Sequence, residues 1–320
     1  MRNFCTHFNI KYLSKAIALH ESMEANIKDY HLFMFIFDDQ SFIFLKEAKL
    51  PNVDLIYYKE FENDELLKIK TERSLKEYLW TVTPFTLTYV FNNFKVDECT
   101  YIDADIYFFN DPSPVFKEVT KYNAIITEHR YHNINDQTFV SGRFCVQFNS
   151  FVRTESSIKV LNDWKNLVAE WCFDRQENGL FGDQMYLDTW PTKYSDIHIA
   201  KHLGIGVAPW NILNYIEFEN APKVSAIHKA SNQRTQIIFY HFHDLTIFSN
   251  HFADLGKYSI NKSILNYIYK PYLVAIKAAN EKILETFKTD EIYMPFQWSI
   301  INILRQFKRI LRSNFNIVRT

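Results

Sequence analysis

The chain has 320 residues, with 36 Lys and Arg against 37 Asp and Glu, and its formal net charge is -1. This balance gives no electrostatic case for binding nucleic acid. Apolar residues make up 47% of the sequence and charged residues 23%, which is typical of a globular protein and excludes a chain that is disordered throughout. The length allows one large domain, or one domain with a substantial appendage.

Strands and helices alternate in the first part of the chain. Apolar runs predict strands over residues 3–8, 31–37, 53–58, 99–102 and 123–127. Helices are predicted over 14–24 with Ser14 as N-cap, over 41–48, and over 62–93 with an interruption near Thr83-Pro84. This order predicts an α/β fold with an open, mostly parallel sheet flanked by helices. Ligands bind such sheets beyond the carboxyl ends of the strands.

The second part of the chain is less regular. Strands are predicted over 143–148 and 237–242, and helices over 155–173 and 183–190. Residues 264–287 are predicted to be mainly helical, with Pro271 as a local break. No internal repeat or low-complexity linker divides the chain.

The C-terminal segment 295–312 has the pattern of a basic amphipathic helix. An apolar stripe lies beside a basic stripe formed by Arg305, Lys308, Arg309 and Arg312, and no acid follows Glu291. Two interpretations stay open. The helix docks on the core, or residues 296–320 attach the protein peripherally to anionic lipid, as a lipid-linked acceptor would require.

The cysteines and the N-terminus indicate a cytoplasmic location. Cys5, Cys99, Cys145 and Cys172 are far apart and form no CxxC pair, so a zinc site is not expected. Three of them lie in apolar runs typical of buried free thiols, which suits a reducing compartment. We expect no signal peptide and no membrane-spanning helix, because no apolar stretch approaches about 18 residues.

The chain has few glycines for a nucleotide-binding protein. There are six, and neither GxGxxG nor GxxxxGK[ST] occurs, so another group would have to hold any phosphates. Phe (29) and Tyr (19) are abundant, which fits stacking on sugar or base rings and equally fits a biased genome composition.

Two aspartates one residue apart end the predicted strand 99–102. Carboxylates such as those of Asp103 and Asp105 are hard ligands that suit Mg²⁺ or Mn²⁺. A solvated acidic turn is the alternative, but the flanking Thr-Tyr-Ile and Ile-Tyr-Phe-Phe favour metal, because buried carboxylates are costly unless paired or metal-bound. An ion held here would bridge diphosphate oxygens and neutralise a departing nucleoside diphosphate.

Segment 101–109, followed by Asn110-Asp111-Pro112, resembles the Asp-x-Asp strand of glycosyltransferases with the GT-A fold. The resemblance is strongest to glycosyltransferase family 8 and its bacterial surface-polysaccharide relatives. Further segments resemble this family in the right order, and together they span about residues 3–245: 6–12, 80–84, 141–149, 182–187 and 240–243.

The resemblance implies a GT-A-type, Rossmann-like catalytic domain over 1–255 and a helical C-terminal region over 256–320. It implies transfer of a hexose from a nucleoside-diphosphate sugar, a UDP-sugar, to a glycan or glycolipid acceptor in surface polysaccharide or lipopolysaccharide synthesis. Mn²⁺ or Mg²⁺ would assist, and family 8 retains the anomeric configuration. The alternatives are a sugar-nucleotide nucleotidyltransferase, which the missing Gly-rich loop disfavours, and a non-catalytic carbohydrate- or lipid-binding protein on the same fold.

The resemblance also implies a set of metal ligands. Asp103 and Asp105 would bind the ion, and Asp103 would also contact the nucleotide sugar. His241 aligns with the third ligand, while His243 is a rival because residues two apart on a strand point the same way. A histidine in an aromatic strand is otherwise more often a packed core residue.

Catalytic roles follow from the same resemblance, and one arginine is a separate candidate for binding phosphate or acceptor. Asp183 would bind donor hydroxyls and Gln184 would lie near the anomeric carbon, although Asp183 also fits the N-cap of a helix. Arg143 would neutralise phosphate or bind acceptor, unless it is an ordinary exposed strand arginine.

Donor and acceptor contacts complete the expected site. Thr6, Asn9 and Tyr12 would hold the nucleoside, although Asn9 also fits a capping turn before the first helix. Trp210 and Asn211 would line the acceptor pocket, with Trp210 as ordinary core the alternative. The sequence departs from family 8 after His241, where the usual Gly and Lys-Pro-Trp are missing. The resemblance therefore assigns no residue that binds the diphosphate.

Overall fold

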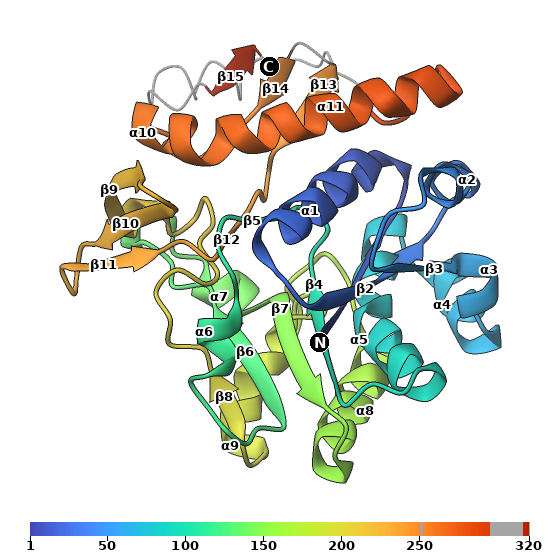
Figure 1. Cartoon of the computed structure of the whole chain (residues 1–320). Helices are drawn as coiled ribbons and strands as arrows, with labels where there is room; N and C mark the ends of the chain where they lie inside the picture. The colour runs from blue at the N-terminus through green and yellow to red at the C-terminus, as the bar shows by residue number, and fades with distance from the viewer. Residues whose placement is uncertain (250–251, 295–315, 320) are drawn as a thin grey trace.

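The fold is built on a seven-stranded sheet in the order β3-β2-β1-β4-β7-β6-β8. The computed structural model describes residues 1–249, 252–294 and 316–319 (Figure 1). All neighbouring strands run parallel except β7, which is antiparallel to both β4 and β6. This arrangement confirms the predicted open, mostly parallel α/β sheet. The strands are β1 (Arg2–Phe8), β2 (Tyr30–Ile36), β3 (Val53–Tyr57), β4 (Glu98–Ile102), β6 (Ala124–Glu128), β7 (Phe144–Val152) and β8 (Ile197–Ile199).

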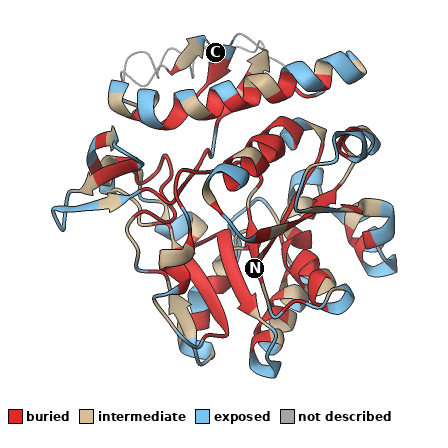
Figure 2. Cartoon of the chain, viewed as in Figure 1, coloured by how far each residue is buried: buried red, intermediate tan, exposed pale blue. Residues whose placement is uncertain are grey.

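Helices cover both faces of this sheet. Because both faces of its central strands are therefore buried, the sequences of these strands are continuous apolar runs. Along β1, Phe4 and Phe8 pack toward α1 (Leu13–Asn26), while Cys5 packs toward α5 (Leu75–Asn93) and α8 (Glu155–Glu170). Figure 2 shows the central strands and the inward faces of these helices as buried.

The first helix starts differently from the prediction. Asn9 caps a short turn, η1 (Ile10–Tyr12), and this turn continues directly into α1. Ser14 therefore lies inside the helix and is not its N-cap. The reason is that the preceding turn already supplies a carbonyl partner, because the Leu13 amide donates to the Ile10 carbonyl.

The long helical segment breaks ten residues earlier than predicted. Helix α4 (Asp64–Glu72) ends before Ser74, and Ser74 and Glu77 form a capping box that starts α5. Pro84 lies buried inside α5 and does not interrupt it. The capping box satisfies the orphan amides of a new helix, whereas one proline removes a single hydrogen bond that packing can offset. Two short helices precede these, α2 (Asp39–Ala48) and α3 (Tyr58–Phe61).

The middle of the chain forms small elements around the edge of the sheet. Strand β5 (Ile106–Phe108) pairs antiparallel with β12 (Phe239–His241), a pairing the sequence did not predict. A three-stranded sheet contains β9 (Tyr215–Asn220), β10 (Val224–His228) and β11 (Gln233–Gln236). The predicted helix 183–190 is a 3-10 helix, η3 (Met185–Thr189), followed by α9 (Trp190–Lys193). The other short helices are α6 (Ser113–Phe116), η2 (Asn133–Asn135), α7 (Thr138–Ser141) and η4 (Ile212–Asn214).

A C-terminal layer packs over α1 (Figure 1). Its main helix α11 (Lys270–Phe287) follows α10 (Lys262–Ile264) and a π-helical turn, η5 (Leu265–Tyr269). Pro271 stands in the first turn of α11, where a missing amide is tolerated. A small sheet joins β13 (Thr246–Ser249), β14 (Phe252–Asp254) and β15 (Ile317–Arg319).

The basic amphipathic helix predicted over 295–312 lies outside the described residues. Within the residues that are described, no helix is long and apolar enough to span a bilayer.

Candidate metal and donor site

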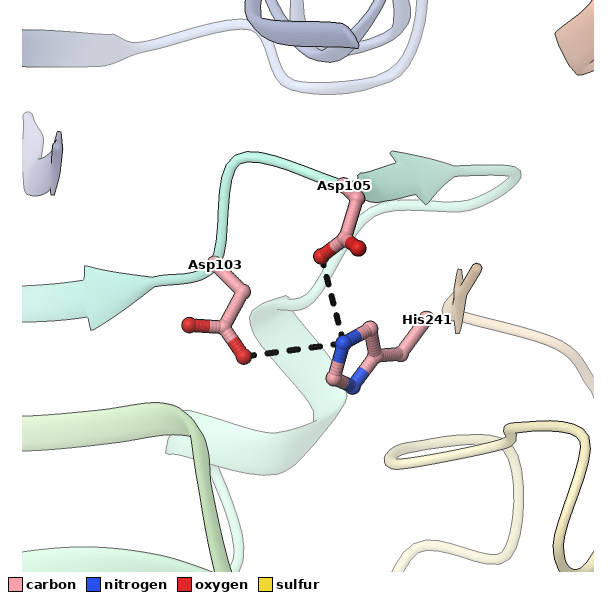
Figure 3. A group of neighbouring side chains, drawn as sticks. All are labelled: Asp103, Asp105 and His241. Carbon is pink, nitrogen blue, oxygen red and sulfur yellow. Dashed lines mark ion pairs between the residues drawn. The ribbon is translucent and has the colours of Figure 1, made fainter. Parts of the chain in front are cut away.

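Two backbone segments bring Asp103, Asp105 and His241 together (Figure 3). Asp103 follows β4, and Asp105 lies in the turn before β5. His241 ends β12, where it pairs in register with Ile106. The amide of the next residue, Phe242, donates to the Asp105 carbonyl at 2.9 Å. The β5–β12 pairing therefore fixes a histidine from late in the chain beside the two aspartates.

The three side chains converge on one point. His241 Nε2 lies 3.1 Å from Asp105 Oδ1 and 3.6 Å from Asp103 Oδ2. One ligand atom from each residue lies within 4.8 Å of the other two, and no other such group of three is found in the described part of the chain. Asp105 and His241 are buried, and Asp103 is half-buried. This geometry fits a single divalent cation.

The charges of this group show the same need for a cation. Burial raises the pKa of Asp105, but His241 and Lys15 outweigh burial and bring the pKa below its usual value. Burial would lower the pKa of His241, but Asp105 and Asp103 raise it well above 6.5. Burial is the main cause of the raised pKa of Asp103. The metal-free group thus keeps a proton on His241, where a divalent ion would take its place.

Gln147 orients the ring of His241 through the ring nitrogen that faces away from the aspartates. His241 Nδ1 lies 2.9 Å from Gln147 Oε1, and Gln147 is completely buried in β7. The amide oxygen only accepts, so Nδ1 carries a proton and donates it, and Nε2 can present a lone pair to the carboxylate side once a metal ion displaces the proton on Nε2. Metal-binding histidines are oriented in this way by a partner of the other ring nitrogen. Imidazole with two carboxylates suits Mn²⁺, and the carboxylates alone suit Mg²⁺.

Tyr101 supports Asp103 in a similar way. Its hydroxyl donates to Asp103 Oδ1 at 2.9 Å and lies 3.1 Å from His7 Nε2. The Thr83 hydroxyl lies 3.2 Å from the same histidine nitrogen. Burial lowers the pKa of His7 to about 3, so His7 is neutral. This buried network fixes the orientation of Asp103 from β1, β4 and α5.

His243 does not join the metal group. Its side chain is exposed, its ring lies edge-on to Trp210 at a centroid distance of 5.4 Å, and it lies 6.0 Å from the ring of His241. Of the two candidate histidines, His241 is the one that the structure places between the aspartates.

Asp183 is buried and interacts electrostatically with Asp103. Burial, and then the negative charge of Asp103, raise its pKa to about 8. Gly182 precedes it with φ of +53°, and Trp164 Nε1 donates to the Asp183 carbonyl at 2.9 Å. The alternative of a helix N-cap at Asp183 is wrong, because η3 starts at Met185 and its N-cap position is Gln184. The Gln184 amide donates to the carbonyl of Ser141 at 2.8 Å.

The expected nucleoside residues lie at the carboxyl end of β1. Thr6 is fully buried, and its hydroxyl has no hydrogen-bond partner within the described residues. Asn9 accepts from the Lys11 amide at 3.2 Å, which confirms its alternative as a capping residue. Tyr12 is 40% exposed, and Lys15 Nζ lies 4.2 Å from the centre of its ring.

The remaining candidates lie in two places, directly before β7 and in the loop between β8 and η4. Arg143 is exposed and pairs with Glu128 at 2.6 Å. Trp210 is buried, donates from Nε1 to the His129 carbonyl at 2.9 Å, and meets the ring of His241 edge-on at 5.4 Å. The buried Asn211 side chain makes three hydrogen bonds to backbone groups of His129, Gly206 and Ala208, which hold the loop in place.

Sequence reasoning missed two residues of this site. Lys15 lies on the buried face of α1, with Nζ 3.7 Å from Asp105 Oδ2. Gln147 interrupts the apolar run Phe-Cys-Val-Gln-Phe. A polar side chain at a core position was the available signal in both cases, because such groups are costly to bury without a partner.

An open, mostly parallel sheet with an Asp-x-Asp turn beyond β4 is the architecture of the GT-A class. Solved glycosyltransferase structures share this fold. The glycosyltransferase GlyE of Streptococcus pneumoniae TIGR4 matches with a TM-score of 0.50 and 13% identity, covering 93% of this chain and 66% of that one. The bifunctional glycosyltransferase WbbM matches with a TM-score of 0.51 and 11% identity, covering 90% of this chain and 52% of that one. The chain therefore has the GT-A fold. It spans just under two-thirds of the length of GlyE and about half of the length of WbbM.

Two proteins of Bacillus subtilis strain 168 are similar in sequence. The uncharacterized protein YfnD is 28% identical over 297 residues, covering 89% of this chain and 92% of the relative. The uncharacterized protein YfnF is 29% identical over 254 residues, covering 77% of this chain and 82% of the relative. No family model matches the chain.

Proposed function

We propose that the protein is a metal-dependent glycosyltransferase that moves a hexose from a nucleoside-diphosphate sugar, a UDP-sugar, to a glycan or glycolipid. The observation that carries the proposal is the Asp103, Asp105 and His241 group beyond β4 of a GT-A fold. Synthesis of surface polysaccharide or lipopolysaccharide at the inner face of the cytoplasmic membrane is the proposed setting.

The metal ligands would be Asp103, Asp105 and Nε2 of His241. A bound Mn²⁺ or Mg²⁺ supplies positive charge to the leaving diphosphate. Gln147 keeps the His241 ring in the tautomer that can ligate, and the Tyr101 hydroxyl keeps Asp103 in place. These partners are buried, so the site is preorganised before donor arrives.

Asp183 and Gln184 are proposed to bind the donor sugar and to lie beside its reacting carbon. A carboxyl group with a pKa of about 8 is protonated at neutral pH and can donate to a sugar hydroxyl as well as accept from one. Burial is the main cause of this raised pKa, and a positive charge placed beside Asp103 would offset only the smaller contribution that comes from repulsion by Asp103. Gln184, held by the Ser141 carbonyl, is proposed to lie near the anomeric carbon, with retention of configuration.

Nucleoside and acceptor contacts are proposed from position. Thr6, Asn9 and Tyr12 lie at the carboxyl end of β1, where donors bind in such sheets. The Thr6 hydroxyl, which finds no hydrogen-bond partner among the described residues, supports a ligand there. Trp210 is buried beside His241 and Asn211 follows it, so the two are proposed to form a wall of the acceptor pocket without stacking on the sugar. The exposed Arg143 is proposed to bind phosphate or acceptor.

Asp103→Asn and Asp105→Asn test the proposal. Each removes a charged ligand, so we expect release of UDP from UDP-sugars to fall by at least about 1,000-fold. Asp111→Asn is the matched control, because Asp111 is exposed and its carboxylate accepts from the Ser113 amide at 2.7 Å. Unchanged turnover in both variants at normal metal concentration would reject the assignment. Binding without turnover in the wild type would indicate a non-catalytic binding protein instead.

Membrane contact through 296–320 is proposed from the sequence alone. Deleting this segment would also remove β15, which pairs with β14. We therefore replace the four basic residues with glutamine and expect less sedimentation with anionic liposomes. Equal sedimentation of the variant would contradict membrane attachment. The four positions are Arg305, Lys308, Arg309 and Arg312.

A further inference from the structure

Lys15 places a buried ammonium group against the metal ligands. Its side chain is 7% exposed, and Nζ lies 3.7 Å from Asp105 Oδ2. The ammonium also donates to the Leu245 carbonyl at 3.3 Å and lies over the ring of Tyr12 at 4.2 Å. The cation thus lies between α1, the Asp-x-Asp turn and the loop after β12.

This position is unfavourable for a lysine that serves only packing. Lys15 stands in the first turn of α1, where the helix dipole disfavours a cation. Its ammonium also loses hydration on burial, so it needs an anion as partner. Among the ion pairs of the described residues, Lys15 is the only lysine or arginine that reaches Asp103 or Asp105.

The pair with Asp105 satisfies this need only while no metal is bound. A divalent ion at the Asp103, Asp105 and His241 group would take over the charge of Asp105. The ammonium of Lys15 would then lie within a few ångströms of a dication in a buried setting, where like charges repel strongly. A second anion beside both cations removes that repulsion, and a diphosphate carries enough charge to bind both.

We infer that Lys15 is the second cation that binds the donor's diphosphate, and that it makes binding of metal and nucleotide cooperative. The inference rests on the proposed function. Without nucleotide, Lys15 competes with metal for Asp105. With nucleotide, Lys15 and metal share the diphosphate oxygens. The two ligands therefore strengthen each other's binding, and by linkage the effect is reciprocal.

Isothermal titration of the full chain tests this inference. The titrants are Mn²⁺ alone, and UDP with and without saturating Mn²⁺. We expect Lys15→Met to weaken UDP binding in Mn²⁺ about 10- to 100-fold, as expected for a lost charge-assisted hydrogen bond. We expect the same variant to bind Mn²⁺ alone at least as tightly as the wild type. Lys282→Met is the charge-matched control, because Lys282 lies on α11 and pairs with Glu21 at 3.6 Å.

The opposite directions of the two affinities separate a phosphate contact from a structural role. If Lys15 has only a structural role, Lys15→Met would weaken the binding of Mn²⁺ and of UDP alike, and that result would overturn the inference. Unchanged UDP binding would overturn it as well. Lys15→Gln adds a second variant that keeps a donor without charge. We expect it to behave like Lys15→Met, and wild-type behaviour would overturn the role of charge. If the wild type binds none of the nucleoside diphosphates UDP, GDP, ADP and CDP in the presence of Mn²⁺, the proposed function itself is wrong.

Discussion

The hydrogen bond between Gln147 and His241 gives the sharpest quantitative test of the metal site. Gln147→Leu removes the acceptor that lies 2.9 Å from His241 Nδ1 and keeps a side chain of similar size. His241 then loses the partner that fixes its tautomer, and the form protonated on Nε2 cannot ligate. Both residues are buried, so water does not readily replace the lost acceptor.

The size of the effect follows from this geometry. Loss of a partner behind a metal-binding histidine weakens metal affinity about 10- to 100-fold, or about 1.4–2.7 kcal/mol. The complete burial of Gln147 places the expectation in the upper half of that range. Gln147→Glu keeps an acceptor, so Mn²⁺ affinity should stay at or above the wild-type value.

The assay is titration of Mn²⁺ at pH 7, with and without UDP. Thr100→Val serves as the control, because it removes a buried 2.9 Å hydrogen bond to Ser150 between β4 and β7 without touching His241. It should lower stability and leave metal affinity unchanged. If Gln147→Leu binds Mn²⁺ within about twofold of the wild type, the argument that Gln147 orients His241 is refuted.

Other predictions follow from the same contacts. Because the carboxylates raise the pKa of His241 above 6.5 despite burial, Mn²⁺ affinity should rise with pH through 6.5 and beyond, and a flat titration profile between pH 6 and 8 would contradict this. In the metal-free protein the stability that protonated His241 contributes is present below pH 6.5 and is lost as pH rises through its folded pKa. Asp183 has a folded pKa of about 8, raised by burial and by the charge of a neighbouring aspartate, so its ionisation costs stability as pH rises from about 4 through 8. Asp183→Asn should therefore be inactive, yet more stable than the wild type at pH 9 by at least about 1 kcal/mol in urea unfolding. Lower stability of this variant would be inconsistent with a buried carboxylate whose ionisation is unfavourable. Gly182→Ala should destabilise the protein by more than about 1 kcal/mol, since φ is +53° and a Cβ would meet the Trp80 ring at 3.2 Å. Gly179→Ala, with φ of +77° and open space around it, should show the backbone cost alone, and equal losses in the two variants would show that the Trp80 contact is harmless.

Short-range patterns in the sequence were enough to predict much of the sheet and the first two ligands. The apolar run over β2 and the Asp-x-Asp turn after β4 depend on neighbours within a few residues, and both were found where expected. Helix starts were less predictable. Ser14 and Pro84 carry ordinary start signals, but η1 and the Ser74–Glu77 capping box provided better partners for the first amides.

The rest of the site depends on pairing between distant segments. His241 and His243 are equivalent in sequence, because both lie on one face of the same apolar run. The antiparallel pairing of β12 with β5 decides between them, since it sets His241 opposite Ile106 and leaves His243 beyond the strand.

Local apolar periodicity and residue chemistry encode the mostly parallel sheet and the paired carboxylates of Asp103 and Asp105, so both could be predicted from the residues alone. The surroundings of those carboxylates depend instead on how distant segments pack together. Gln147 comes from β7 and Lys15 from α1, and each acts through a contact of a few ångströms with a residue far away in the chain. Such contacts leave no mark on local periodicity, because they arise only when the packed sheet removes water and forces buried polar groups to find partners.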